Sequence, residues 1–140
     1  MSTIELADRM SRARATVFLF FAAVILLALW FSFGPSGTDF FQGLWFGITL
    51  ASVLNLLPIK RWLRPGSLVA RLMDDEAVRE HRRMSCTAGF WAATTAAFAV
   101  ALIAHDAPPV SAFDAARVVA TAAVVAALVS FATLELRAGA

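Results

Sequence analysis

The sequence contains few charged residues and only one cysteine. Charged residues make up 16% of its 140 residues, whereas hydrophobic residues make up 60%, so it departs from the composition of a soluble protein. The net charge of +2 is too small to indicate nucleic-acid binding. A lone Cys86 excludes an intramolecular disulfide and a zinc site built from several cysteines. We therefore expect neither a soluble nor a nucleic-acid-binding protein.

Motifs that carry chemistry are also missing. The sequence has no glycine-rich phosphate loop and no HExxH or GxSxG pattern. Haem or metal binding inside a helical bundle needs histidines on facing helices, but His81 and His105 fall at opposite ends of one predicted helix. No nucleophile lies beside a base and a third orienting group. We predict a protein that is not an enzyme and that binds no cofactor or metal.

Charged residues are absent from three apolar stretches, residues 16–33, 40–59 and 85–104, and a fourth stretch, residues 113–134, contains only Asp114 and Arg117 near its start. A helix of about 20 residues crosses a hydrocarbon core of roughly 30 Å while satisfying its own backbone. A cleaved signal peptide explains the first stretch less well, because no small-x-small cleavage site follows it. We predict an all-α fold: a four-span transmembrane helical bundle of two helical hairpins, forming a single membrane domain over residues 1–140.

Lysine and arginine are absent from the two short connections between predicted spans. They collect before the first span and in the loop of residues 60–84, and short loops rich in these residues stay in the cytoplasm. Both termini and this loop are therefore predicted to be cytoplasmic in a multi-pass protein of a cell membrane, in bacteria the inner membrane. The exception is Arg117, which is expected to reach the surface and pair with Asp114. Ser111 and Asp114 have the spacing of a capping box that begins the last span.

Charged residues are concentrated in the loop of residues 60–84. After a turn at residues 65–67, apolar residues at 68, 69, 72 and 73 predict a short amphipathic cytoplasmic helix. Acidic residues 74–76 then suit the start of a helix that runs into the third span. Four arginines are candidate contacts for a partner or for anionic lipid: Arg71, Arg79, Arg82 and Arg83. Alternatively, these residues only set topology and form ion pairs along the helix.

Small residues recur every fourth position in the third stretch: Ser85, Gly89, Ala93, Ala97 and Ala101. In lipid, helices associate largely by close packing, which small side chains permit. We predict a tight hairpin between the third and fourth spans, although the same stripe suits a homodimer.

Polar residues inside the spans are few. Thr49, Ser52 and Asn55 are candidates for an intramembrane polar contact, either with a neighbouring helix or along a pore. Glu135, at the end of the fourth stretch, is expected to pair with Arg137 or with an arginine of the 60–84 loop.

These features favour a small non-enzymatic membrane protein, an accessory subunit or scaffold that presents its charged cytoplasmic loop. Its expected partners are the lipid bilayer and a membrane protein or further copies of itself. The alternative hypothesis is a small transporter or channel that acts as a homo-oligomer, because four spans are few for a complete pathway.

Overall fold

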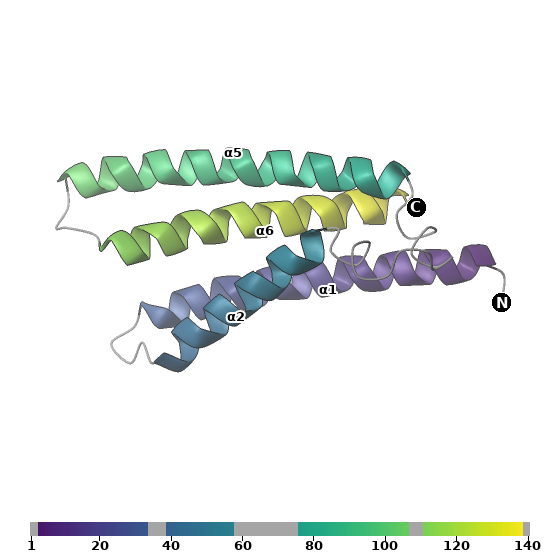
Figure 1. Cartoon of the computed structure of the whole chain (residues 1–140), viewed down its shortest axis with the longest axis horizontal. Coiled ribbons are helices and arrows are strands. Elements are labelled where there is room, and N and C mark those ends of the chain that lie inside the picture. Colours follow the sequence, from purple (N-terminus) through teal and green to yellow (C-terminus); the bar gives the residue numbers. More distant parts are fainter. Residues whose placement is uncertain (1–2, 34–38, 58–75, 107–110, 139–140) are drawn as a thin grey trace.

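The structure is a computed structural model that describes residues 3–33, 39–57, 76–106 and 111–138. These ranges contain α1 (Thr3–Ser32), α2 (Asp39–Leu56), α5 (Glu76–Asp106) and α6 (Ala112–Ala138), and no strand. The prediction of an all-α fold is confirmed. α1 and α2 form one hairpin, and α5 and α6 form a second (Figure 1).

The helices begin and end where the local sequence requires it. α1, α2 and α5 each end within three residues of a proline, namely Pro35, Pro58 and Pro108, because proline disfavours helical geometry in the residue before it. α6 begins after Ser111, whose hydroxyl accepts a hydrogen bond of 3.0 Å from the backbone N–H of Asp114. The side chain therefore satisfies one of the unpaired donors of the first turn, as the predicted cap requires.

Within the part of the chain that the structure describes, three helices are long and apolar enough to cross a membrane. The apolar segments are Ser11–Ser32 in α1, Val78–His105 in α5 and Ala112–Ala138 in α6. Among the described residues, α2 does not belong to this group, since Asp39, Gln42 and Asn55 lower the apolar character of its 18 residues. A fourth span therefore stays a prediction. The predicted amphipathic helix and Arg71 lie outside the described residues.

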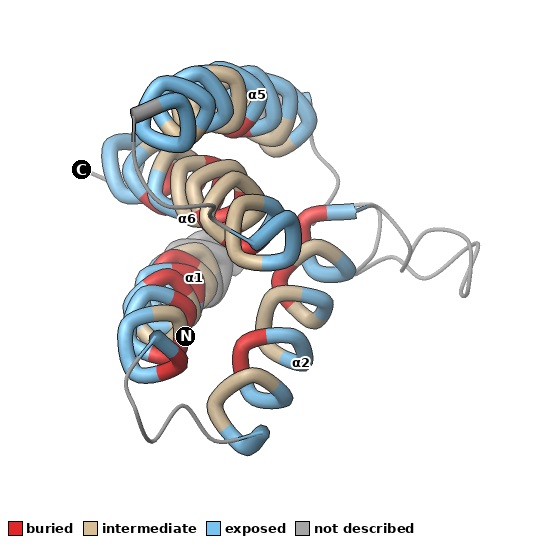
Figure 2. The backbone as a smooth tube through the Cα atoms, turned by 90° about the vertical axis from the view of Figure 1, so that its left-hand side faces the viewer, coloured by how far each residue is buried: buried red, intermediate tan, exposed pale blue. Residues whose placement is uncertain are grey.

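α6 occupies the centre of the arrangement. It contacts each of the other three helices, and the end-on view places it between α5 and the α1–α2 hairpin (Figure 2). The N-terminal half of α5 packs closely on α6 at Gly89, where a Cβ atom would lie 2.7 Å from the carbonyl oxygen of Ala123. The two hairpins are thus joined through α6.

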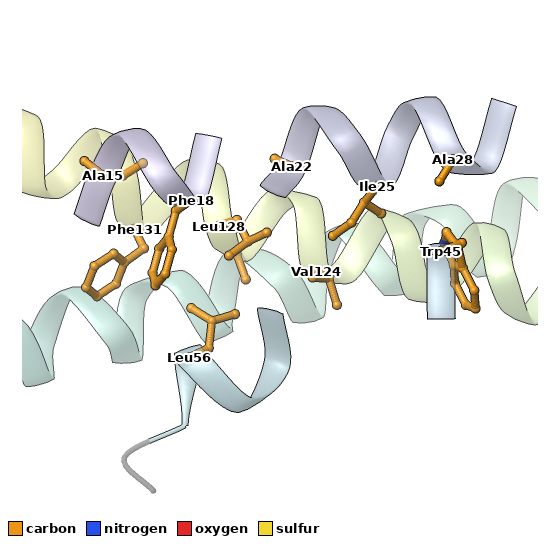
Figure 3. Close-up of a cluster of buried hydrophobic side chains, with 12 residues drawn as sticks. Ala15, Phe18, Ala22, Ile25, Ala28, Trp45, Leu56, Val124, Leu128 and Phe131 are labelled. Carbon is orange, nitrogen blue, oxygen red and sulfur yellow. The ribbon is translucent and has the colours of Figure 1, made fainter. Parts of the chain in front are cut away.

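The apolar core lies between α1 and α6 and is closed by two side chains of α2 (Figure 3). α1 contributes every third or fourth residue of one face. Its residues are Ala15, Phe18, Ala22, Ile25 and Ala28, which meet Val124, Ala127, Leu128, Phe131 and Ala132 of α6 and Trp45 and Leu56 of α2. The rings of Phe18 and Phe131 are 5.2 Å apart. Removal of such a ring from a packed core typically costs about 3–5 kcal/mol.

α5 leaves most of its large apolar side chains outside the fold. Leu102 is 71% exposed and Phe98 68% exposed, and very little of the apolar segment of α5 is buried within the chain. A continuous apolar surface of this kind is unfavourable in water. It is suited to contact with lipid tails or with another apolar helix.

Candidate functional site

A polar cluster joins three helices where the start of α1, the start of α5 and the end of α6 meet. Its centre is Glu135, a carboxylate that is only 5% exposed. Arg14 of α1 donates to Oε1 of Glu135 at 2.5 Å, and the hydroxyl of Ser11 donates to Oε2. From α5, Nδ1 of His81 lies 3.7 Å from the same Oε1. One carboxylate therefore binds side chains from two helices other than its own.

The helical repeat brings these residues together. Ser11 and Arg14 continue the buried stripe of α1 by one further turn beyond Ala15 and Phe18, because residues three or four apart share a helix face. Glu135 continues the buried stripe of α6 in the same way, four residues after Phe131. The polar cluster is therefore the end of the α1–α6 interface, where the apolar core gives way to ionisable groups.

Phe131 is the residue of the apolar core that contacts the polar cluster. The guanidinium of Arg14 lies 5.0 Å from the centre of its ring, and His81 approaches the ring edge with a centroid distance of 6.4 Å and an interplanar angle of 85°. A cation over an aromatic face is attracted by the ring quadrupole. The ring thus positions both basic side chains of the cluster beside Glu135.

Two buried nitrogens of the cluster have no hydrogen-bond partner, Nε of Arg14 and Nδ1 of His81. Such atoms are costly to bury. The ion pair of Arg14 with Glu135, at 2.5 Å, compensates part of this cost. Ser85, one turn after His81, donates to the backbone carbonyl of His81 at 2.6 Å.

A second buried charge lies at the opposite end of α6. Arg117 is 2% exposed, and its guanidinium is surrounded by three aromatic rings at 5.2–5.5 Å, those of Phe33, Trp45 and Phe113. It donates to the hydroxyl of Ser32 and, over 3.4 Å, to Asp114. The predicted pairing with Asp114 is present, but the side chain is buried rather than directed to the surface.

Three of the four arginines predicted as partner contacts lie on the first turns of α5, close in sequence to His81 of the polar cluster. Arg79 and Arg83 are exposed on the first turns of α5, and Arg82 is half-buried beside them. Arg9, near the start of α1, and Arg137, near the end of α6, are also exposed. The start of α1 and the end of α6 lie at the same end of the helical arrangement (Figure 1). We call Arg9, Arg79, Arg83 and Arg137 the basic end. Arg71, the remaining predicted contact, is outside the described residues.

The predicted intramembrane polar residues do not share one surface. Ser52 is fully buried and donates to the carbonyl of Ile48 at 2.7 Å. Thr49 is half-buried, and its hydroxyl oxygen is buried without a hydrogen-bond partner. Asn55 is exposed and donates to the carbonyl of Ala51 at 2.8 Å. Asn55 therefore lies on the exposed face of α2, whereas Ser52 and Thr49 lie towards the interior.

The small-residue stripe of α5 changes its surroundings along the helix. Ser85 and Gly89 are buried, Ala93 is half-buried, and Ala97 and Ala101 are exposed. Close contact with α6 thus involves the part of the stripe nearer to the polar cluster.

The polar cluster is centred on an ion pair between α1 and α6. Within the described residues, no three His, Cys, Asp or Glu side chains come together in a way that could hold a metal ion. Cys86 is exposed, five residues after His81. An ion pair of this kind, with the imidazole of His81 beside it, can hold the three helices together.

Comparison with known proteins gives no match: no family model, curated protein or solved structure resembles the chain. The fold and site together define a small all-helical protein with three helices suited to a membrane and with buried charges at the two ends of its central helix.

Proposed function

We propose that the chain is a multi-pass membrane protein of non-enzymatic type, an accessory subunit or scaffold that presents a charged cytoplasmic surface to a protein partner. The observation that carries the proposal is the basic end. Its exposed arginines come from α1, α5 and α6, and the polar cluster around Glu135 holds the same three helices together. Cations fixed in one arrangement favour a specific anionic partner more than cations on a flexible loop do.

Charge asymmetry supports the proposed orientation. The basic end lies at the ends of α1 and α6 that carry the termini, whereas the opposite end contains Arg117, which is buried among aromatic rings. Arginine retained on one side is the signature of the cytoplasmic face. We accordingly propose that both termini and the basic end face the cytoplasm and that, for a bacterial protein, the membrane is the inner one.

Site-directed labelling tests the orientation and the number of spans. In a Cys86→Ser background, single cysteines at Ala112 and Phe40 should react with a membrane-impermeant maleimide added to intact cells. Cysteines at Arg83 and Leu57 should react only after the membrane is opened. All four parent residues are exposed in the structure. If the cysteines at Phe40 and Leu57 react from the same side, α2 does not span the membrane.

Photocrosslinking in native membranes tests the partner. A photoreactive residue at Arg83 should capture one protein repeatedly, while the same residue at Phe98, on the apolar face of α5, should not. Reversing both charges with Arg79→Glu and Arg83→Glu should abolish capture from a probe placed at Glu80. The matched variant with lysine at both positions keeps the charge and should retain capture. Equal capture by the reversed and lysine variants would contradict the proposed function.

A transporter or channel acting as a homo-oligomer is the second candidate. Its support is the hydroxyl of Thr49, which is buried without a partner and would gain one from a polar solute or water. In reconstituted vesicles, Thr49→Val should then lower flux, and Asn55→Leu serves as a comparison at an exposed position. Absence of flux for the wild type, or equal flux for wild type and Thr49→Val, would exclude this candidate.

A further inference from the structure

The polar cluster contains one imidazole beside its carboxylate. His81 is the only imidazole that approaches Glu135 in the described part of the chain, since the other histidine, His105, is exposed in the last turn of α5. Nδ1 of His81 is buried, lacks a hydrogen-bond partner and lies 3.7 Å from Oε1 of Glu135. That separation is too long for a hydrogen bond but within the range of an ion pair.

We propose that His81 and Glu135 form a proton-operated latch, which fastens the first turns of α5 to α1 and α6 when His81 is protonated. The neutral imidazole has no net charge, so at 3.7 Å it attracts the carboxylate only weakly. Addition of one proton to the ring gives both nitrogens a hydrogen and creates a cation beside the anion. No other bond is made or broken.

The charges that face His81 determine the sign of the effect. From α6 it faces the carboxylate of Glu135, and from α1 it faces the region of Arg14, a cation that would repel a protonated imidazole. Arg14 is bound to Glu135 at 2.5 Å, however, so the field of this pair is largely that of a dipole with its negative oxygen towards His81. On α5 itself, Glu80 is exposed, and the helix dipole weakens beyond the first turn. Protonation therefore tightens the contact.

The latch controls the α5 segment that carries two residues of the basic end, Arg79 and Arg83. Arg79 and Arg83 lie two residues before and after His81. Further along α5, Ser85 is fully buried and Gly89 lies close to Ala123 of α6. Release of His81 would leave the turns before Ser85 with fewer attachments, and elements with few buried contacts open first. The latch rests on the proposed function, because its consequence is that acidification fixes the arginines offered to the partner.

Hydrogen–deuterium exchange of the full-length chain in vesicles of neutral phosphatidylcholine tests the latch. Wild type, His81→Gln and the matched control His105→Gln are compared at about pH 5.5 and about pH 8, on either side of the usual range of imidazole titration. Each variant is compared with wild type at the same pH, so the intrinsic pH dependence of exchange cancels. Amides of residues 80–85 should exchange about two- to fivefold faster in His81→Gln at the lower pH.

At the higher pH the exchange rates of His81→Gln and wild type should be equal, and His105→Gln should match wild type in this segment at both values. In a Glu135→Gln background, His81→Gln should have no effect at either pH. If Glu135→Gln does not insert, the two histidine variants still decide the question.

Three results would overturn the latch: no difference at the lower pH, an equal difference at both pH values, or slower exchange in His81→Gln, which would mean that repulsion by Arg14 dominates. The exchange measurement contains no partner protein. A failed latch therefore leaves the photocrosslinking result intact, and failed capture with the expected exchange pattern overturns the proposed function alone.

Discussion

Replacement of Gly89 by alanine tests the packing of α5 on α6. A Cβ atom at this position would lie 2.7 Å from the carbonyl oxygen of Ala123 and 3.2 Å from Cβ of Ala127. The first of these atoms belongs to the backbone of α6, so it cannot move aside as the tip of a side chain can. The added methyl group must push the two helices apart.

The magnitude follows from two opposing effects. Alanine favours a helix over glycine by about 1 kcal/mol, whereas overpacking a well-packed interface costs about 1–3 kcal/mol. Gly43 and Gly47 of α2 provide the matched control, since a Cβ atom there would meet nothing within 4 Å. Gly89→Ala should therefore be less stable than Gly43→Ala or Gly47→Ala by about 1–3 kcal/mol, with the helix-propensity gain cancelling in the comparison.

The free energy of unfolding can be measured by titrating the purified protein in mild-detergent micelles with a denaturing detergent and following tryptophan emission. The chain has four tryptophans to report the transition. Equal stabilities for all three variants would show that α5 does not approach α6 at Gly89, and the packing described above would be wrong.

Three further sets of variants test the contacts of α6 by the same titration. Trp45→Phe removes the indole that donates to Thr121 at 2.8 Å and should cost about 1 kcal/mol, while Trp30→Phe, at a residue 75% exposed, should change little; equal losses would refute the buried bond. Arg117→Lys keeps the charge but loses the planar guanidinium among three rings and should cost about 1–2 kcal/mol, unlike Arg137→Lys at an exposed site; if the two variants are equally stable, Arg117 is not enclosed. Glu135→Gln and Arg14→Gln should each destabilise the chain, but the double variant should lose less than the sum of the two; strict additivity would contradict a direct pair.

Local spacing in the sequence was sufficient to predict the features that lie within one helix. The start of α6 at Ser111 and the pairing of Asp114 with Arg117 depend on residues three apart, and both are present. The apolar stretches of α1, α5 and α6 are likewise local. Their helices extend further than the predicted spans: α1 begins at Thr3 and α5 at Glu76. The charged residues in these extensions have good helix propensity and therefore lengthen the helices.

Contacts between distant helices were not accessible in the same way. Glu135 was expected to pair with Arg137 or with an arginine of the 60–84 loop, but its partner is Arg14, which is 121 residues away in the sequence. Neither helix alone shows which residue of the other helix will be its partner. The sequence of α1 does show that Ser11 and Arg14 need partners, because they continue the stripe of small and apolar residues at Ala15 and Phe18, and polar residues on a buried stripe require hydrogen bonds.

The burial of Arg117 has a similar explanation. Rotamer freedom alone allows a long side chain near a helix end to extend to the membrane surface. Instead, Ser32, Phe33 and Trp45 enclose it, and their positions depend on how the α1–α2 hairpin meets α6. Only the packed structure shows that the guanidinium of Arg117 finds its hydrogen-bond partners, Ser32 and Asp114, inside the fold.

The central position of α6 affects how the protein is made. On the ribosome, α1 and α2 are synthesised long before α6, yet Arg14 and Trp45 find their hydrogen-bond acceptors on α6. A nascent chain that has not yet released its final helix therefore contains an α1–α2 hairpin whose polar groups still lack their acceptors. The contacts of the hairpin are completed late in translation, and a stop codon ahead of residue 112 would leave Arg14 and Trp45 without these acceptors.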